Sequence, residues 1–486
     1  MKKSVAVNTV FNVSYKLLNI LFPLVTSVYL SRILGAAYLG KVGYAQSILS
    51  YFVVFASLGI PTYGMREIAK AGNDKALRDK VFSELFIINL TSSLISTVLY
   101  LIVVFGIDSL RADIYLYMCV GLTLFMNVFN IDWFYAGQEE YVYITVRSFI
   151  IKLISIIAIL VIIKEQSDYR IYALITSLAT TGNYVLNVIN LRKKVKFCFH
   201  GIALKKHLQP VFILVMTMLA TDLYNQVDVT MLGIFRTEEE VGFYSNGIRL
   251  ARIVYSVTTA ISATSLPRMC YYFKNNKSEE FKGLFWNIFR YVMLLSLPAA
   301  VGIALVSNKL VVLLFGEEFY PTGKIVQLLA IIIAIISFSY LIGSVVLTAT
   351  ENEKYLLKAT VVGAVTNFVL NAFLIPDFGT TGAVIASITG ESAVFGVHLY
   401  YGWKYVKSKL DYKFMASVLI SVLGMAVVVK LVYSFEFSNL VSVLLSAGSG
   451  ILAYYIMLKL TRNNVLLALE KMVIKKLKRR KKRLIC

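Results

Sequence analysis

The chain has few of the residues from which enzyme and metal sites are usually built. Its 486 residues include three histidines, three tryptophans and four cysteines. The cysteines show neither the spacing of a disulfide framework nor that of a zinc site. The sequence contains no phosphate-binding P-loop, which argues against ATP as the direct energy source, and no nucleophile at catalytic spacing from a base. We therefore expect a protein without a cofactor.

Charged residues are also scarce, which excludes an ordinary soluble protein. They make up 16% of the chain, hydrophobic residues make up 58%, and the mean hydropathy is +0.72. Soluble domains contain about 25% charged and about 45–50% apolar residues. The net charge of +22 suggests nucleic acid at first, but the basic residues share the chain with long apolar runs. We expect an integral membrane protein with no nucleic-acid partner.

Long apolar runs dominate what is present. A membrane-spanning helix needs about 20 mostly apolar residues, and by that measure we predict an all-α protein with about fourteen transmembrane helices. They cover residues 8–30, 39–60, 82–106, 114–136, 142–163, 171–191, 209–234, 242–262, 285–306, 322–347, 357–376, 380–402, 415–433 and 439–460. The predicted organisation is a six-helix lobe (1–191), a basic cytoplasmic linker (192–208), a second six-helix lobe (209–404), two additional helices (405–460) and a polybasic cytoplasmic tail (461–486).

The basic residues indicate the orientation of the chain. Fourteen spans place both termini on one side, and the segments on that side carry 32 of the 49 lysines and arginines, against 6 on the other side. Cytoplasmic loops are enriched in these residues. Both termini are therefore predicted to be cytoplasmic, where the polybasic tail would contact anionic membrane lipids.

Short motifs recur in the two predicted lobes in the same order. The sequence GIP at 59–61 is matched by SLP at 265–267, and ILG at 33–35 is matched by MLG at 231–233. Because six spans separate matching helices, the copies run in the same direction. This pattern predicts two lobes related by a pseudo-two-fold axis along the membrane normal, with alternating access to a cleft between them.

Ionisable residues inside the spans point to this cleft, because each costs about 2.5–3.5 kcal/mol at mid-bilayer. Basic residues outnumber acidic ones there, so we predict a cationic cavity for an anionic solute, with phosphate as the natural candidate. The predicted substrate-binding residues are Lys16, Arg147, Lys152, Arg249, Arg252 and Arg290. The predicted polar lining is Asn12, Asn19, Asn187, Asn225, Gln226, Asn367 and Asn371.

Structural roles compete with these assignments. Arg249 or Arg252 could form an ion pair with an aspartate of the preceding span. Arg147 and Arg290 lie close enough to span ends for their charged groups to reach the interface. His207, in the basic linker, is interpreted as a solvated loop residue.

The sequence also resembles a known family. The segments RILGAAYLG (32–40) and SLGIPTYGMREIA (57–69) resemble the opening of bacterial polysaccharide flippases of the Wzx type, and DVTMLG (228–233) with VGFY (241–244) resembles the start of their second lobe. These flippases belong to the multidrug/oligosaccharidyl-lipid/polysaccharide (MOP) exporter superfamily. The resemblance implies transfer of undecaprenyl-diphosphate-linked oligosaccharides across the bacterial cytoplasmic (inner) membrane for O-antigen, lipopolysaccharide or capsule synthesis. It also implies proton or sodium coupling, for which Asp222, Asp228 and Glu391 are the candidates. A polysaccharide polymerase and glycosyltransferases are the implied partners.

Two other functions compete with the flippase. A multidrug or cation antiporter of the same superfamily should have an acidic, aromatic cavity rather than a cationic one. A membrane enzyme that polymerises lipid-linked glycans should carry catalytic groups in its exported loops, and the longest of these, 307–321, offers only Lys309, Glu317 and Glu318. We therefore expect a transporter and not an enzyme.

Overall fold

The protein is an all-α membrane protein. The computed structural model describes the backbone of residues 5–192, 194–198, 200–408, 411–468 and 470, and the side chains of these residues except 5–21, 24, 213 and 217. The described residues are 88% helical and contain no strand. This confirms the predicted fold class.

The chain divides into two compact units, residues 1–245 with 368–383, and residues 246–367 with 384–486. The predicted lobe boundaries at 191 and 209 stay a prediction. The helices of the first unit are α1 (Val5–Ser57), α2 (Ile60–Ala71), α3 (Lys75–Gly106), α4 (Asp108–Arg111), α5 (Ile114–Phe125), η1 (Asn127–Phe129), α6 (Asp132–Gly137), α7 (Tyr141–Ile162), η2 (Gln166–Asp168), α8 (Tyr169–Leu191) and α9 (Lys205–Phe235). It also contains the start of α10 (Glu238–Ala263) and the middle of α14 (Lys354–Val406).

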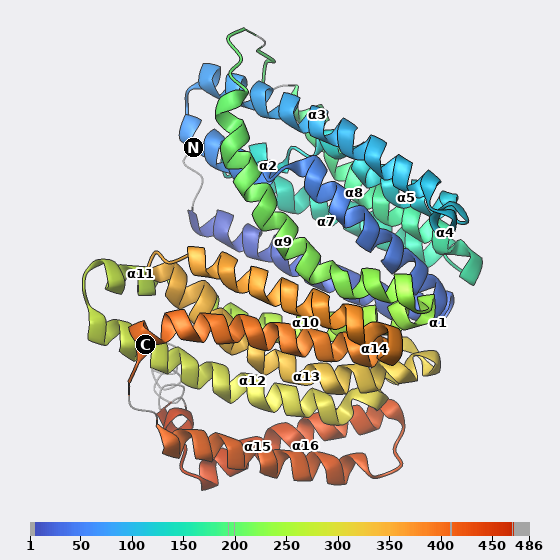
Figure 1. Ribbon diagram of the computed structural model, residues 1–486. Coiled ribbons are helices and arrows are strands. Elements are labelled where there is room, and N and C mark those ends of the chain that lie inside the picture. The colour runs from blue at the N-terminus through green and yellow to red at the C-terminus, as the bar shows by residue number, and fades with distance from the viewer. Residues whose placement is uncertain (1–4, 193, 199, 409–410, 469, 471–486) are drawn as a thin grey trace, which may run out of the picture. The chain divides into compact units, whose positions relative to one another are not determined.

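Helix α1 is the central element of the first unit. It packs against α3, α5, α7, α8 and α9, and α7 and α8 lie side by side (Figure 1). Tyr100, Leu124 and Ala173 lie in one core cluster with α1 and have no exposed surface. A second cluster surrounds Phe82, whose ring packs on Trp133 and Phe134. These two cores hold the helices that carry the polar residues described below.

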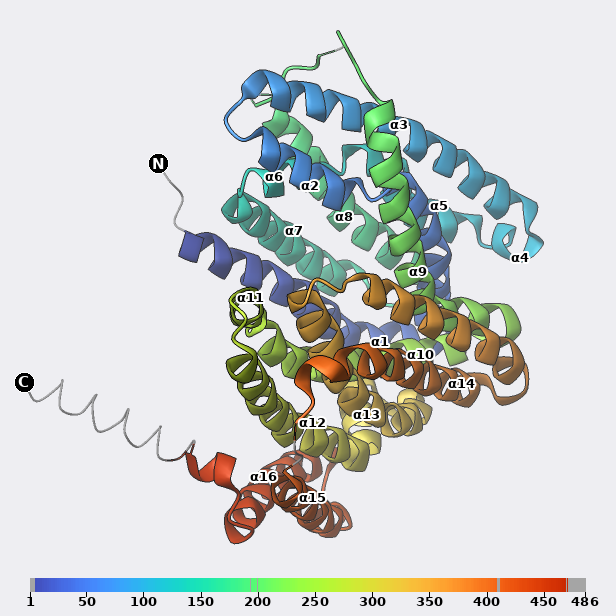
Figure 2. The same ribbon diagram turned by 60° about the vertical axis from the view of Figure 1, so that its left-hand side comes forward.

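The second unit consists of the rest of α10 and α14 together with α11 (Leu266–Lys274), α12 (Ser278–Phe315), η3 (Glu317–Phe319), α13 (Tyr320–Tyr340), the π-helix η4 (Leu341–Leu347), α15 (Tyr412–Tyr433) and α16 (Asn439–Leu460). Helix α12 packs along α13, and the pair α15–α16 packs on α12 (Figure 2). The π-helix passes close to a buried histidine: a Cβ added at Gly343 would lie 2.4 Å from Cε1 of His398.

Two very long helices contain a break at a glycine. Helix α1 and helix α14 each have 53 residues, which at about 1.5 Å per residue is about 80 Å, far more than the roughly 30 Å hydrocarbon core. Gly35 (φ 74°) interrupts α1, and Gly379 (φ 54°) interrupts α14. Both have positive φ, which glycine adopts without the steric cost of a Cβ. Each break falls between two predicted spans.

Among the residues described, nine helical stretches are long and apolar enough to cross a membrane. Those that contain the breaks each overlap two predicted spans, and every predicted span overlaps a helix. The total of fourteen crossings stays a prediction. The short helices α2 and α11 begin at the matching motifs 59–61 and 265–267, each with proline at its N-terminus, where the missing N–H costs no hydrogen bond.

Candidate functional site in the membrane helices

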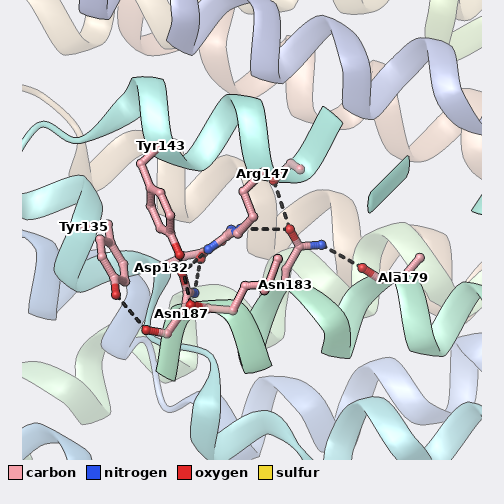
Figure 3. A network of polar contacts seen from close by, with 9 residues as sticks. Asp132, Tyr135, Tyr143, Arg147, Ala179, Asn183 and Asn187 are labelled. Carbon is pink, nitrogen blue, oxygen red and sulfur yellow. Dashed lines mark hydrogen bonds and ion pairs between the residues drawn. The ribbon is translucent and has the colours of Figure 1, made fainter. Parts of the chain in front are cut away.

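Arg147 lies at the centre of a buried polar network in the first unit (Figure 3). It projects from α7 toward α8, where Asn183 and Asn187 are one turn apart and therefore share a face. The guanidinium Nε donates to Oδ1 of Asn183 at 2.9 Å, Nη1 donates to Oδ1 of Asn187, and Nη2 lies 2.9 Å from Oδ1 of Asp132. Three helices, α6, α7 and α8, thus meet at one charged group.

The polar groups of this network are paired with one another. The Arg147 side chain is 3% exposed and that of Asp132 is 31% exposed. Asn187 donates to Asp132 at 2.5 Å, and the Arg147 guanidinium lies 5.3 Å from the ring centroid of Tyr143. A buried charge persists only when paired and hydrogen-bonded. The arrangement therefore fixes α6, α7 and α8 together. Substrate binding by Arg147 and Asn187 stays a prediction.

A second buried cluster joins two residues predicted for different roles. Asp228 on α9 is 7% exposed, and Asn371 on α14 has no exposed surface. The Asn371 amide donates to Oδ1 of Asp228 at 2.6 Å, and the Tyr244 hydroxyl donates to Oδ2. This buried carboxylate therefore accepts a hydrogen bond on each of its oxygens. The coupling role of Asp228 stays a prediction.

The second unit contains the other predicted pair of arginines. Arg249 and Arg252 lie one turn apart on α10; Arg249 is half-buried and Arg252 is exposed. The side chain of Arg252 hydrogen-bonds with Tyr255, and Glu391 on α14 is close enough to act electrostatically on Tyr255. Asn367 is 1% exposed. The unit therefore presents an accessible positive charge next to an aromatic ring and an acidic residue.

The remaining predicted residues lie at several separate places. Lys152 is half-buried, with its ammonium 5.3 Å from the Phe22 ring centroid. Arg290 forms an ion pair with Asp411 at 3.1 Å. In α9, Asp222 and Gln226 are half-buried, and the exposed Asn225 donates to the carbonyl of Thr221. The side chains of Lys16, Asn12 and Asn19 lie outside the described residues, as does most of the polybasic tail, residues 471–486.

The sequence analysis missed a buried cluster around Glu84. This residue of α3 has no exposed surface, and its Oε2 lies 2.9 Å from Nε2 of His207 and 2.8 Å from Nζ of Lys206. The Tyr63 hydroxyl lies 2.9 Å from Nδ1 of the same imidazole. The interpretation of His207 as a solvated loop residue is wrong, because the ring is buried between α2 and α3. The sequence feature that could have indicated this cluster is Glu84 itself, because it is an acidic residue inside an apolar run.

Replacing Glu84 by alanine is expected to destabilise the first unit by about 3–5 kcal/mol, the usual cost of removing one partner of a buried ion pair. The change leaves Lys206, His207 and the backbone N–H of Ala203 without their shared acceptor. The measurement is the melting temperature of detergent-solubilised protein, with size-exclusion chromatography used to detect the protein that remains folded after heating. Glu67→Ala, which removes an exposed i,i+3 pair with Lys70, is the control. Equal melting temperatures for the two variants would contradict the assigned role of Glu84.

Together, the fold and these buried polar networks define a polytopic helical membrane transporter. The chain belongs to the family described as polysaccharide biosynthesis protein, whose model matches residues 5–273, and a model of lipid II flippase MurJ matches residues 185–452. The predicted resemblance to Wzx-type flippases of the MOP superfamily is confirmed.

Curated relatives agree with this family. The chain is similar to putative O-antigen transporters of Shigella dysenteriae, at 22% identity over 77% of this chain and 93% of the relative, and of Escherichia coli K12, at 24% identity over 79% and 93%. It is also similar to a probable low-salt glycan biosynthesis flippase, Agl15, of Haloferax volcanii, at 30% identity. That match spans 45% of each chain, so less than half of Agl15 is covered.

Solved structures show the same fold. The lipid II flippase MurJ in an inward closed conformation matches with a TM-score of 0.77 and 15% identity, over 94% of this chain and 100% of that chain. An inward-facing MATE family transporter of the MOP superfamily matches with a TM-score of 0.62 and 13% identity, over 82% and 98%. At these identities the likeness concerns the fold alone.

Proposed function

We propose that this protein is a flippase that moves lipid-linked oligosaccharides from the cytoplasmic to the outer leaflet of a cytoplasmic membrane, for the synthesis of O-antigen, capsule or a related polysaccharide. The observation that carries the proposal is the similarity to two putative O-antigen transporters over more than three quarters of the chain. The match of residues 185–452 to a model of lipid II flippase MurJ supports it. The whole activity is that of a transporter, and no catalytic step is part of the proposal.

The chemistry of the cargo explains why charged residues persist in apolar helices. A diphosphate carries negative charge whose transfer into hydrocarbon is very costly unless it is paired. Arginine offers several donors in a planar fork that matches phosphate oxygens. Arg249 and Arg252, on adjacent turns of α10, are the pair of arginines best suited to such a headgroup. In this proposal the lipid tail stays in the bilayer while the headgroup crosses beside the protein's polar residues.

The proposal includes several further features that rest on the sequence. Both termini are cytoplasmic, as the distribution of basic residues indicates. Movement of a proton or sodium ion down its gradient, coupled through Asp222, Asp228 or Glu391, supplies the energy. Of these, Asp228 is a buried carboxylate within the membrane helices. A polysaccharide polymerase and glycosyltransferases supply and consume the cargo, and anionic lipids contact the basic tail.

Deletion of the gene tests the proposed function. We expect surface polysaccharide to be lost and a lipid-linked oligosaccharide to accumulate on the inner leaflet, with both effects reversed by the intact gene. The measurement is mass spectrometry of extracted lipid-linked glycans, combined with their accessibility to a glycosidase added to intact cells. Unchanged glycans together with greater sensitivity to cationic drugs would instead identify a multidrug antiporter of the same superfamily.

A further inference from the structure

A cavity of about 930 Å³ lies entirely within the first unit. It is bounded by the second half of α1, the ends of α3 and α9, and the starts of α5 and α8, together with the connection that contains α4. The distribution of basic residues predicts that this end of the unit faces the exported side of the membrane. Its size lies within the range of about 300–1,000 Å³ that small-molecule sites occupy.

The wall of the cavity is rich in aromatic rings. Tyr44, Tyr51 and Phe52 recur on one face of α1, and Tyr117 and Tyr169 face them from α5 and α8. The polar end of one of these rings is held in place: the Tyr51 hydroxyl lies 2.8 Å from that of Thr230, which donates to Ser47 at 3.0 Å. The cavity thus has flat apolar faces with ordered hydroxyl groups beside them.

The rim of the cavity carries charged groups. Asp113 accepts a hydrogen bond from Nε of Arg170 at 2.8 Å and another from the Tyr169 hydroxyl at 2.5 Å. The Lys41 ammonium lies 5.9 Å from the Tyr169 ring centroid. A buried acyl chain needs none of these groups. The rim instead suits a ligand with many hydroxyl groups.

Close helix contacts fix the shape of the cavity before any ligand binds. A Cβ added at Gly40 would lie 1.7 Å from the carbonyl oxygen of Glu238, and one added at Gly242 would lie 2.1 Å from that of Ala36. The start of α10 is thereby held against α1 at the edge of the cavity. A Cβ added at Gly233 would lie 2.1 Å from Cδ2 of Tyr44. The Tyr44 ring keeps its place only because residue 233 has no side chain.

We propose that this cavity is a glycan-binding site that holds one or two pyranose rings of the transported oligosaccharide on the exported side of the membrane. The inference rests on the proposed function. The C–H face of a pyranose is apolar and packs on an aromatic ring, whereas its hydroxyl groups need polar partners. Tyr44 and Tyr117 supply the rings, and Thr230, Lys41 and the Asp113–Arg170 pair supply the partners. The site retains the sugar after translocation, before the next enzyme takes it.

The test uses the full chain in lipid nanodiscs, with chitobiose and cellobiose as probes, and saturation-transfer difference NMR as the measurement. We expect the intact protein to transfer saturation to ring protons of at least one disaccharide. Gly233→Ala should reduce this signal at least threefold, because the new methyl group displaces the Tyr44 ring into the cavity. The matched control is Gly182→Ala in α8, where a Cβ would make an ordinary 3.7 Å contact with Ile151.

Three results would overturn the assignment of the cavity. They are an absence of saturation for both sugars, equal saturation of the intact protein and Gly233→Ala, and an equal loss in both glycine variants. Transport of lipid-linked oligosaccharide, extracted from a deletion strain, is measured in parallel in proteoliposomes. Transport without sugar binding would reject the assignment of the cavity as a sugar site and leave the proposed flippase function unaffected. Sugar binding without transport would reject the proposed flippase function and leave the cavity assigned as a sugar-binding site.

Discussion

Replacing Arg147 by alanine is expected to remove most of the folded protein. The change leaves the carboxylate of Asp132 and the amide oxygens of Asn183 and Asn187 without their common donor. Removing one partner of a buried ion pair costs about 3–5 kcal/mol, and we expect the lower end because the Asp132 side chain is 31% exposed. This is a large part of the roughly 5–15 kcal/mol by which proteins are stable. The measurement is the amount and melting temperature of monodisperse protein after solubilisation.

Two further variants separate a structural role for Arg147 from a role in substrate binding. Arg192→Ala removes an exposed arginine at the end of α8 and should change stability by no more than about 0.5 kcal/mol. The double variant Arg147→Met with Asp132→Asn removes both charges and should recover part of the lost stability. An Arg147→Ala protein with normal melting and no transport would refute the structural assignment and favour the cavity prediction.

Replacing both Arg249 and Arg252 by alanine is expected to abolish transport while the protein folds normally. Arg252 is exposed and Arg249 is half-buried, so their removal leaves no tightly packed core defect. Two positive charges beside a diphosphate contribute strongly because the surroundings are apolar. We expect at least a tenfold lower rate of surface-polysaccharide synthesis, with a protein amount within about twofold of the intact chain.

The same experiment distinguishes charge from geometry. Lysine at both positions keeps the charge but loses the planar fork of donors, so it should restore transport only in part. Arg268→Ala, on the exposed surface of α11, is the matched control and should leave transport unchanged. Normal polysaccharide output from the double alanine variant would refute the proposed contact with the headgroup.

The sequence predicted the class of the protein and the positions of its helices well, for a physical reason. Burial in lipid requires each spanning segment to satisfy its own backbone hydrogen bonds and to be apolar along its length, so the signal is local in the chain. The helix breaks at Gly35 and Gly379 could also be predicted from the sequence, because they lie between apolar runs. The network around Arg147 could not be predicted from the sequence, because Asp132 and Asn183 lie 15 and 36 residues away from Arg147 along the chain.

Hydropathy and charge distribution by themselves determined that this chain is a helical membrane protein, because both depend on the residue content of single segments of the chain. The partners of its charged groups were decided only by tertiary structure. Whether Arg147 faces Asn187, or His207 reaches Glu84, depends on the rotation of each helix about its axis and on the register between neighbours. Long-range packing sets these two quantities, and no local pattern of residues records them.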